Sequence, residues 1–234
     1  MLAIFKREFK AYFVSPTGYI FLGFMLFLSA LFFTGSNYQN SLTDMTMYFN
    51  SLGITFLFMV PLLTMRLLAE DKRNKTDQLL ITAPVSIVKI VLGKYFAAVA
   101  LFGLYMVITL LYPFTLSLYG APVMGTIITL YIGFFLLGAS LISIGVFITS
   151  LTESQVTAAI ASFAVILIIW FSGSIATAVN NKYVTIVVQW LSLLSRFNGY
   201  LTGIFDPSAL LYYITFAALF IFLTVLSIEK RRWD

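Results

Sequence analysis

Residues 124–149 read MGTIITLYIGFFLLGASLISIGVFIT, a run without a single charged side chain. An α-helix needs about 20 apolar residues to cross the hydrocarbon core of a bilayer, so this stretch is long enough to span a membrane. The whole chain has the same character, because 61% of its 234 residues are hydrophobic and only 10% are charged. Soluble domains carry about 25% charged residues. The sequence therefore predicts an all-α integral membrane protein.

The same length criterion selects six spans. They cover roughly 17–36, 51–69, 95–118, 124–149, 156–178 and 208–228. Lys and Arg gather in cytoplasmic loops, so they indicate the orientation of the spans. With the N-terminus inside, only Lys182 and Arg196 of the 14 Lys and Arg residues fall outside. We therefore expect a multi-pass protein of the cytoplasmic membrane with both termini in the cytoplasm.

Residues 1–14 combine apolar and basic side chains at helical spacing, which is typical of an amphipathic helix lying along the membrane. The apolar face is formed by Leu2, Phe5, Phe9 and Tyr12, and the basic face by Lys6, Arg7 and Lys10. Ser15-Pro16 would end this helix before the first span. No signal-peptide cleavage site is visible, so we expect the segment to be retained.

The stretch 179–207 has an apolar core, residues 184–194, that is too short to cross a membrane. A crossing there would also place the basic residues 230–232 outside. We expect re-entrant or extracellular helices between the fifth and sixth spans. Asp206 and Pro207 are typical of the first positions of the last helix.

Several classes of protein are excluded by the residues that the chain lacks. With no His and no Cys, the usual zinc sites, a haem His ligand, a Ser-His-Asp triad and a thiol nucleophile are excluded. The pair Gly93-Lys94 lacks the upstream glycine of a P-loop, so the chain itself is not expected to bind ATP. The basic residues lie beside apolar spans, where topology explains them better than nucleic acid does. We expect no catalytic, metal or cofactor site.

The largest polar cluster follows the second span. Residues 70–78 read EDKRNKTDQ and are followed by LLITAPV. A solvated loop is one interpretation. In the other, Thr76 and Asp77 start a short helix that Pro84 ends. Such a helix would expose Leu79, Leu80 and Ile81 as an apolar tip suited to docking a soluble partner.

Segment 66–98 resembles the region after the second span of ABC-2 type transporter permeases, most closely the gliding-motility and NosY-like branch. Those chains carry an acidic residue, a Thr-x-x-Leu-Leu run, a Thr-Ala-Pro-Val motif and a Gly-Lys pair that opens the third span. Here these are Glu70, Thr76, Leu79-Leu80, Thr82-Ala83-Pro84-Val85 and Gly93-Lys94. The six spans, the N-terminal Lys6-Arg7-Glu8 and the basic tail fit the same family.

The resemblance implies a single ABC-2 transmembrane domain over residues 1–234, the permease subunit of an ATP-driven exporter and not an enzyme. Separate ABC ATPase subunits would bind ATP and magnesium, and a second permease copy or a paralogue would complete the membrane part. Some related systems add an auxiliary extracellular subunit. The coupling loop would be 70–94, with contacts through Glu70, Thr76, Asp77, Leu79, Leu80, Thr82 and Pro84. Lys6 and Arg7 of the N-terminal elbow helix would also touch the ATPase.

Four features keep two interpretations each. Arg66 ends the second span, where an ionisable residue is either functional or snorkels to the interface, and we favour snorkelling. Glu153, between the fourth and fifth spans, either contacts the ATPase or caps the fifth span beside Ser154. Tyr105, Tyr112 and Tyr119 share one face, which favours packing over a substrate path. Small residues allow close helix approach, either within the chain or at a dimer seam. They are Gly133, Gly138, Ser140, Ser143 and Gly145 in the fourth span, and Ala158 and Ser162 in the fifth.

Three other functions remain as alternatives. A secondary carrier or channel would work without an ATPase, but the chain lacks the intramembrane charges that proton-coupled carriers use. Pro61 and Pro113 could each still kink a span. An intramembrane enzyme lacks its usual catalytic residues here. An anchoring or assembly subunit would need only the docking loop.

Overall fold

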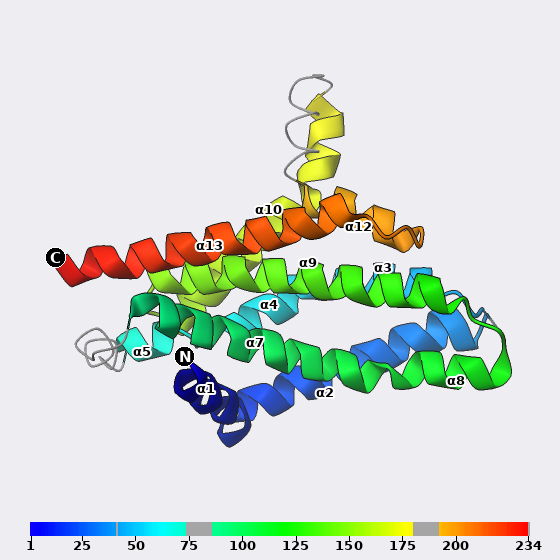
Figure 1. Cartoon of the computed structure of the whole chain (residues 1–234), viewed down its shortest axis with the longest axis horizontal. Coiled ribbons are helices and arrows are strands. Elements are labelled where there is room, and N and C mark those ends of the chain that lie inside the picture. The colour runs from blue at the N-terminus through cyan, green and yellow to red at the C-terminus, as the bar shows by residue number, and fades with distance from the viewer. Residues whose placement is uncertain (41, 74–85, 180–191, 234) are drawn as a thin grey trace.

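In the computed structural model the chain forms an elongated bundle of helices (Figure 1). The structure describes residues 1–40, 42–73, 86–179 and 192–233, and contains no strand among them. Within this part, five helices are long and apolar enough to cross a membrane. They become six if the bent pair Thr46–Gly53 and Phe56–Arg73 is counted as one span. The expected all-α membrane architecture is thus confirmed, and the six expected spans are all present if the bent pair is counted as one.

The first helix lies across the bundle. Figure 1 shows α1 (Leu2–Val14) nearly end-on, whereas the long helices are seen lengthwise. Ser15 has φ −97° and ψ 159°, the extended conformation favoured before a proline, and this turns the chain into α2 (Pro16–Phe33). The π-helical turn η1 (Thr34–Tyr38) extends the first span. Leu2, predicted for the apolar face, is 74% exposed, whereas Ile4 lies against Gly93 of the third span.

The second span is broken, where the sequence predicted one helix over 51–69. It consists of α3 (Thr46–Gly53), α4 (Phe56–Thr64) and the short α5 (Ala69–Arg73). A bend of 54° separates α3 from the helices that follow. At the bend the indole of Trp170 lies so close to Gly53 that a Cβ atom there would be 2.8 Å from it.

The third span begins earlier than the predicted residue 95 and is also interrupted. It consists of α7 (Ile87–Thr109) and α8 (Leu111–Tyr119). Lys94 lies inside α7 and is 1% exposed. The prediction began the span after this lysine because a charged residue seemed to end the apolar run, but carboxylates from distant parts of the sequence neutralise its charge. The interruption has a simple cause: Pro113 has no N–H for the carbonyl of Thr109. The hydroxyl of Tyr131 donates to that carbonyl instead, at 2.8 Å.

The remaining helices are α9 (Met124–Leu151), α10 (Gln155–Val179), α12 (Leu193–Leu201) and α13 (Pro207–Trp233). As predicted, Asp206 caps α13, accepting from the N–H and the hydroxyl of Ser208 at 2.8 and 2.9 Å. α12 is the described helical part of the predicted 179–207 excursion, and it packs against α9 and α13. Both termini lie at the end of the bundle where α5 is found (Figure 1).

The small residues of α9 serve packing within the chain. A Cβ atom on Gly138 would be 2.5 Å from the Phe102 ring, and one on Gly133 would be 2.5 Å from Tyr200. Ser140 donates to the carbonyl of Tyr213 at 3.2 Å. Ser143 and Gly145 of α9 are buried as well, as are Ala158 and Ser162 of α10. α9 can therefore be the central helix, because its small side chains admit neighbours from several sides.

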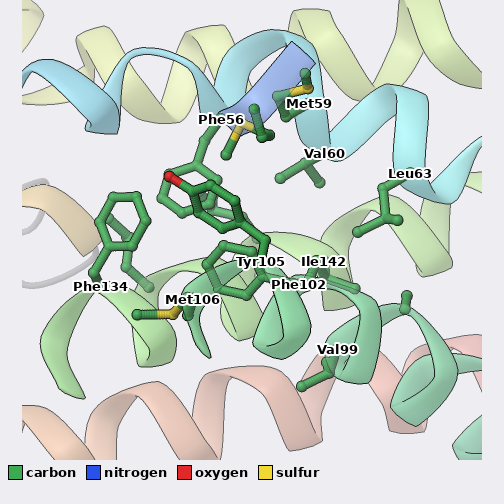
Figure 2. Close-up of a cluster of buried hydrophobic side chains, with 14 of the residues drawn as sticks. Phe56, Met59, Val60, Leu63, Val99, Phe102, Tyr105, Met106, Phe134 and Ile142 are labelled. Carbon is green, nitrogen blue, oxygen red and sulfur yellow. The ribbon is translucent and has the colours of Figure 1, made fainter. Parts of the chain in front are cut away.

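Aromatic rings fill the space beside α9. Figure 2 shows Phe56, Phe102 and Phe134 in one cluster, with ring centroids 4.6–6.0 Å apart. Such tilted and edge-on pairs stabilise a core beyond the area they bury. The predicted packing role of the tyrosine stripe is confirmed for Tyr105, which is buried, and for Tyr112, which stacks on Phe33 at 4.5 Å.

Tyr119 differs from the other two tyrosines of the stripe, being 89% exposed. It is the last residue of α8, which begins at Leu111 and also contains Tyr112. The predicted packing of the stripe therefore holds on both sides of the interruption at Leu110, but not at the end of α8.

Candidate functional site

A buried lysine organises the end of the bundle at which both termini lie. Lys94 Nζ is 3.1 Å from Glu8 Oε1 of α1 and 2.7 Å from Asp71 Oδ2 of α5. It also donates to the carbonyl of Leu67 at 2.5 Å. These four residues are the Lys94 cluster. Burying a charge is costly unless it is paired and hydrogen-bonded, so these contacts are what allow Lys94 to be 1% exposed.

Glu8 binds a second cation. Arg7 Nη2 lies 2.6 Å from Glu8 Oε1, the same oxygen that contacts Lys94. The hydrogen bond to the Glu8 carboxylate, with the attraction of its charge, holds the pKa of Arg7 above its ordinary value. Glu8 is therefore shared between an exposed cation and a buried one.

A second group of polar contacts, the Arg66 cluster, holds the turn between α1 and α2. Arg66 Nε is 2.6 Å from Glu70 Oε2, and its Nη1 donates to Thr17 Oγ1 at 3.0 Å and to the Ser15 hydroxyl. Arg66 was expected only to snorkel, but it also ties the end of the second span to the start of the first. Nearby, the Tyr12 hydroxyl donates to the Leu63 carbonyl at 2.9 Å, and burial raises the pKa of Tyr12, so the donor stays protonated.

Between α1 and α5 the two clusters line an open cavity of about 290 Å³. Three cations and three carboxylates line it: Arg7, Arg66, Lys94, Glu8, Glu70 and Asp71. On the far side of α5, the Lys72 ammonium donates to the Ser150 carbonyl at the end of α9. Among the described residues, no group of three His, Cys, Asp or Glu side chains could hold a metal ion. The arrangement holds helices together by charge.

The predicted coupling loop 70–94 is only partly described. Glu70 is in α5, paired with Arg66, while residues 87–94 belong to α7, so that part of the predicted loop is helical instead. The other proposed contacts, Thr76, Asp77, Leu79, Leu80, Thr82 and Pro84, lie outside the described residues. The helix expected near 76–83 therefore stays a prediction.

The other predicted ATPase contacts lie at the surface. Lys6 and Arg7 are exposed on α1, and Glu153 is exposed in the turn between α9 and α10. The N–H of Thr157 reaches the Ser154 hydroxyl at 3.5 Å, so the capping position belongs to Ser154. Lys6, Arg7 and Glu153 thus lie at the surface, and their contact with an ATPase stays a prediction.

Glu8, Asp71 and Lys94 were not predicted as site residues. One signal was present in the sequence: Glu8 is the only acidic residue between Met1 and Ser15, in a helix otherwise rich in Lys and Arg. An acid among basic residues can pair with its own neighbours, as Glu8 does with Arg7, so this signal alone did not point to a distant partner. Its identity could not be read, because Lys94 is 86 residues further along the chain.

Comparison with known families agrees with this architecture. The family model described as ABC-2 family transporter protein matches residues 30–228, most of the chain. No curated protein matches the chain. A chain with five to six apolar helices and this match is a multi-pass membrane protein of the transport class. It belongs to the ABC-2 transporter family and is a membrane permease of an ABC transporter, a transport component that typically works with an ATPase subunit.

Proposed function

We propose that this chain is the permease subunit of an ATP-driven exporter, of the gliding-motility and NosY-like branch of the family. Separate ATPase subunits would hydrolyse ATP, and this chain would carry substrate across the cytoplasmic membrane together with a second permease copy or a paralogue. Its ATP and magnesium would be bound by the partner subunits and not by this chain. An auxiliary extracellular subunit would complete some such assemblies.

The observation that carries the proposal is the position of segment 74–85 between two anchored helices. The segment follows α5 and precedes α7, and the ion pair between Asp71 and Lys94 joins these helices. Contacts of Lys72 with α9 and of Lys94 with α1 anchor them further. A displacement of this segment would therefore be transmitted to several spans at once. The motif residues of the family resemblance, from Thr76 to Val85, fall in this segment.

The proposed mechanism is mechanical. Closure of the ATPase dimer on ATP would move the short helix around residues 76–83 with the cleft that holds it. The paired ends of α5 and α7 would transmit the motion to the spans, and the opening between the two permeases would change. Lys6, Arg7 and Glu153, exposed at the same end, would add contacts to the ATPase.

The orientation in the membrane belongs to the same proposal. Both termini lie at the end that carries α5, where most of the Lys and Arg residues gather. The positive-inside rule places this end in the cytoplasm. α12 and the start of α13 would then face the outside.

A charge placed in the apolar tip tests the docking helix. We expect Leu79→Asp and Leu80→Asp to abolish copurification of the ATPase subunit, because an apolar contact would have to desolvate a carboxylate. Both variants should still insert and dimerise. The control is Ile204→Asp, the same kind of change at a residue that is 64% exposed beside α12. Normal ATPase association in both tip variants would refute the docking helix.

A further inference from the structure

The Lys94 cluster joins three segments that are far apart in the sequence. Glu8 comes from α1, Asp71 from α5, and Lys94 from α7. α5 leads directly into segment 74–85 and α7 follows this segment. α1 does not flank the segment, because α2, η1, α3 and α4 separate α1 from α5 in the sequence. The ion pair with Glu8 is therefore a direct polar connection between α1 and the frame of the proposed coupling segment.

Next to Lys94, α1 and α7 pack in close contact. A Cβ atom on the neighbouring Gly93 would be 2.9 Å from Ile4 Cγ2 of α1. The absence of a side chain at Gly93 thus lets α1 sit directly on α7, with Glu8 one helical turn beyond Ile4. The buried ammonium has three hydrogens and three acceptors within reach, namely Glu8, Asp71 and the Leu67 carbonyl.

We infer that Lys94 is a positioning residue that makes α1, α5 and α7 move as one body. Motion delivered to segment 74–85 would then reach the third span and the N-terminal helix together. This inference rests on the proposed function for the origin of the motion. It adds a specific point of transmission to α1, a helix that lies before the residues 30–228 matched by the family model.

The right variant removes the whole buried charge set. Lys94→Met alone would leave the two carboxylates without the buried cation, and the chain could fail to fold. The triple variant Glu8→Gln, Asp71→Asn, Lys94→Met replaces all three charges with neutral groups of similar shape, which buried ion clusters often tolerate. This variant should insert into the membrane and melt like the unmodified chain, but α1 should no longer be connected to α5 and α7 by ion pairs. Lys230→Met, an exposed charge at the same end, is the matched control.

The chain has no cysteine, so a pair of spin labels can be introduced cleanly. We place them at Lys10→Cys on α1 and Lys89→Cys on α7, both exposed. In the unmodified cluster and in Lys230→Met, the distance distribution between the labels should be narrow, and ATP should not change it in the complex with the ATPase. In the triple variant it should broaden, and ATP should shift it, because α1 no longer follows α7.

Two outcomes would overturn the inference. A narrow distribution in the triple variant, unchanged by ATP, would show that packing at Gly93 suffices and that Lys94 positions nothing. A broad distribution in the unmodified chain would show that the three helices are not one body. If instead no ATPase subunit binds the chain at all, the proposed function fails, and the label distances of the isolated permease still decide whether the Lys94 cluster joins α1 to α7.

Discussion

The glycines of α9 illustrate how single atoms determine the packing of this protein. Gly138 faces the rings of Phe102 and Phe56, at distances of 2.5 and 3.1 Å from the position of a Cβ atom. Gly125, in the same helix, has nothing within 4 Å of that position. Both glycines are helical, but Gly138 is packed against side chains and Gly125 has open space beside it.

We predict that Gly138→Ala destabilises the protein by about 1–3 kcal/mol, because the added methyl group overpacks a filled core. Gly125→Ala should be neutral or stabilising by up to about 1 kcal/mol, since alanine favours helix. Thermal unfolding of the detergent-solubilised variants measures both. Equal melting temperatures for the two variants would contradict the close approach at Gly138.

Among the elements, the third span is interrupted by a proline, and a tyrosine hydroxyl from a neighbouring helix stabilises the interruption. Pro113 leaves the Thr109 carbonyl without its helical donor, and Tyr131 of α9 supplies one at 2.8 Å. Thr109 is buried, so an unsatisfied carbonyl there would be costly. The break in one helix is thus stabilised by a side chain of another.

A double-mutant cycle tests this relation. Tyr131→Phe should cost about 1–3 kcal/mol in the unmodified chain, because it leaves a buried acceptor unsatisfied. In the Pro113→Ala background the same change should cost much less, since the alanine N–H can bond the Thr109 carbonyl. Unfolding free energies of the four variants provide the measurement. An equal cost in both backgrounds would show that the two residues act independently.

Elements were predictable where composition decides them and not where distant contacts do. The apolar run 124–149 became α9, and the cap at Asp206 formed, because both depend on neighbouring residues. The bend before Phe56 was not predictable, because it lies at Gly53, against Trp170 of another helix. The early start of α7 depends in the same way on carboxylates from α1 and α5 that neutralise Lys94.

The whole molecule has two chemically different ends. The end with α5 carries the Lys94 and Arg66 clusters, and the opposite end carries α12 and the loop before α13. The distribution of Lys and Arg along the sequence was sufficient to predict that both termini share one end (Figure 1). The joining of α1 to α7 could not be predicted, since it needs Glu8 and Lys94 to meet across 86 residues.

Cysteine labelling of intact cells tests the proposed orientation. Asn198→Cys on α12 should react with a membrane-impermeant maleimide added outside, and Lys10→Cys on α1 should react only after the cells are opened. Both side chains are exposed, so access depends on the side of the membrane. The reverse pattern would place both termini outside and contradict the proposed contact with a cytoplasmic ATPase.

Copurification from the native membrane decides whether this permease works with an ATPase subunit. The C-terminus is tagged, the protein is extracted gently from its native membrane, and the copurifying chains are identified. We predict a stoichiometric subunit that carries a P-loop. Repeated mild preparations that contain only the chain itself would refute the ATPase partner and favour a carrier or channel that functions without ATP.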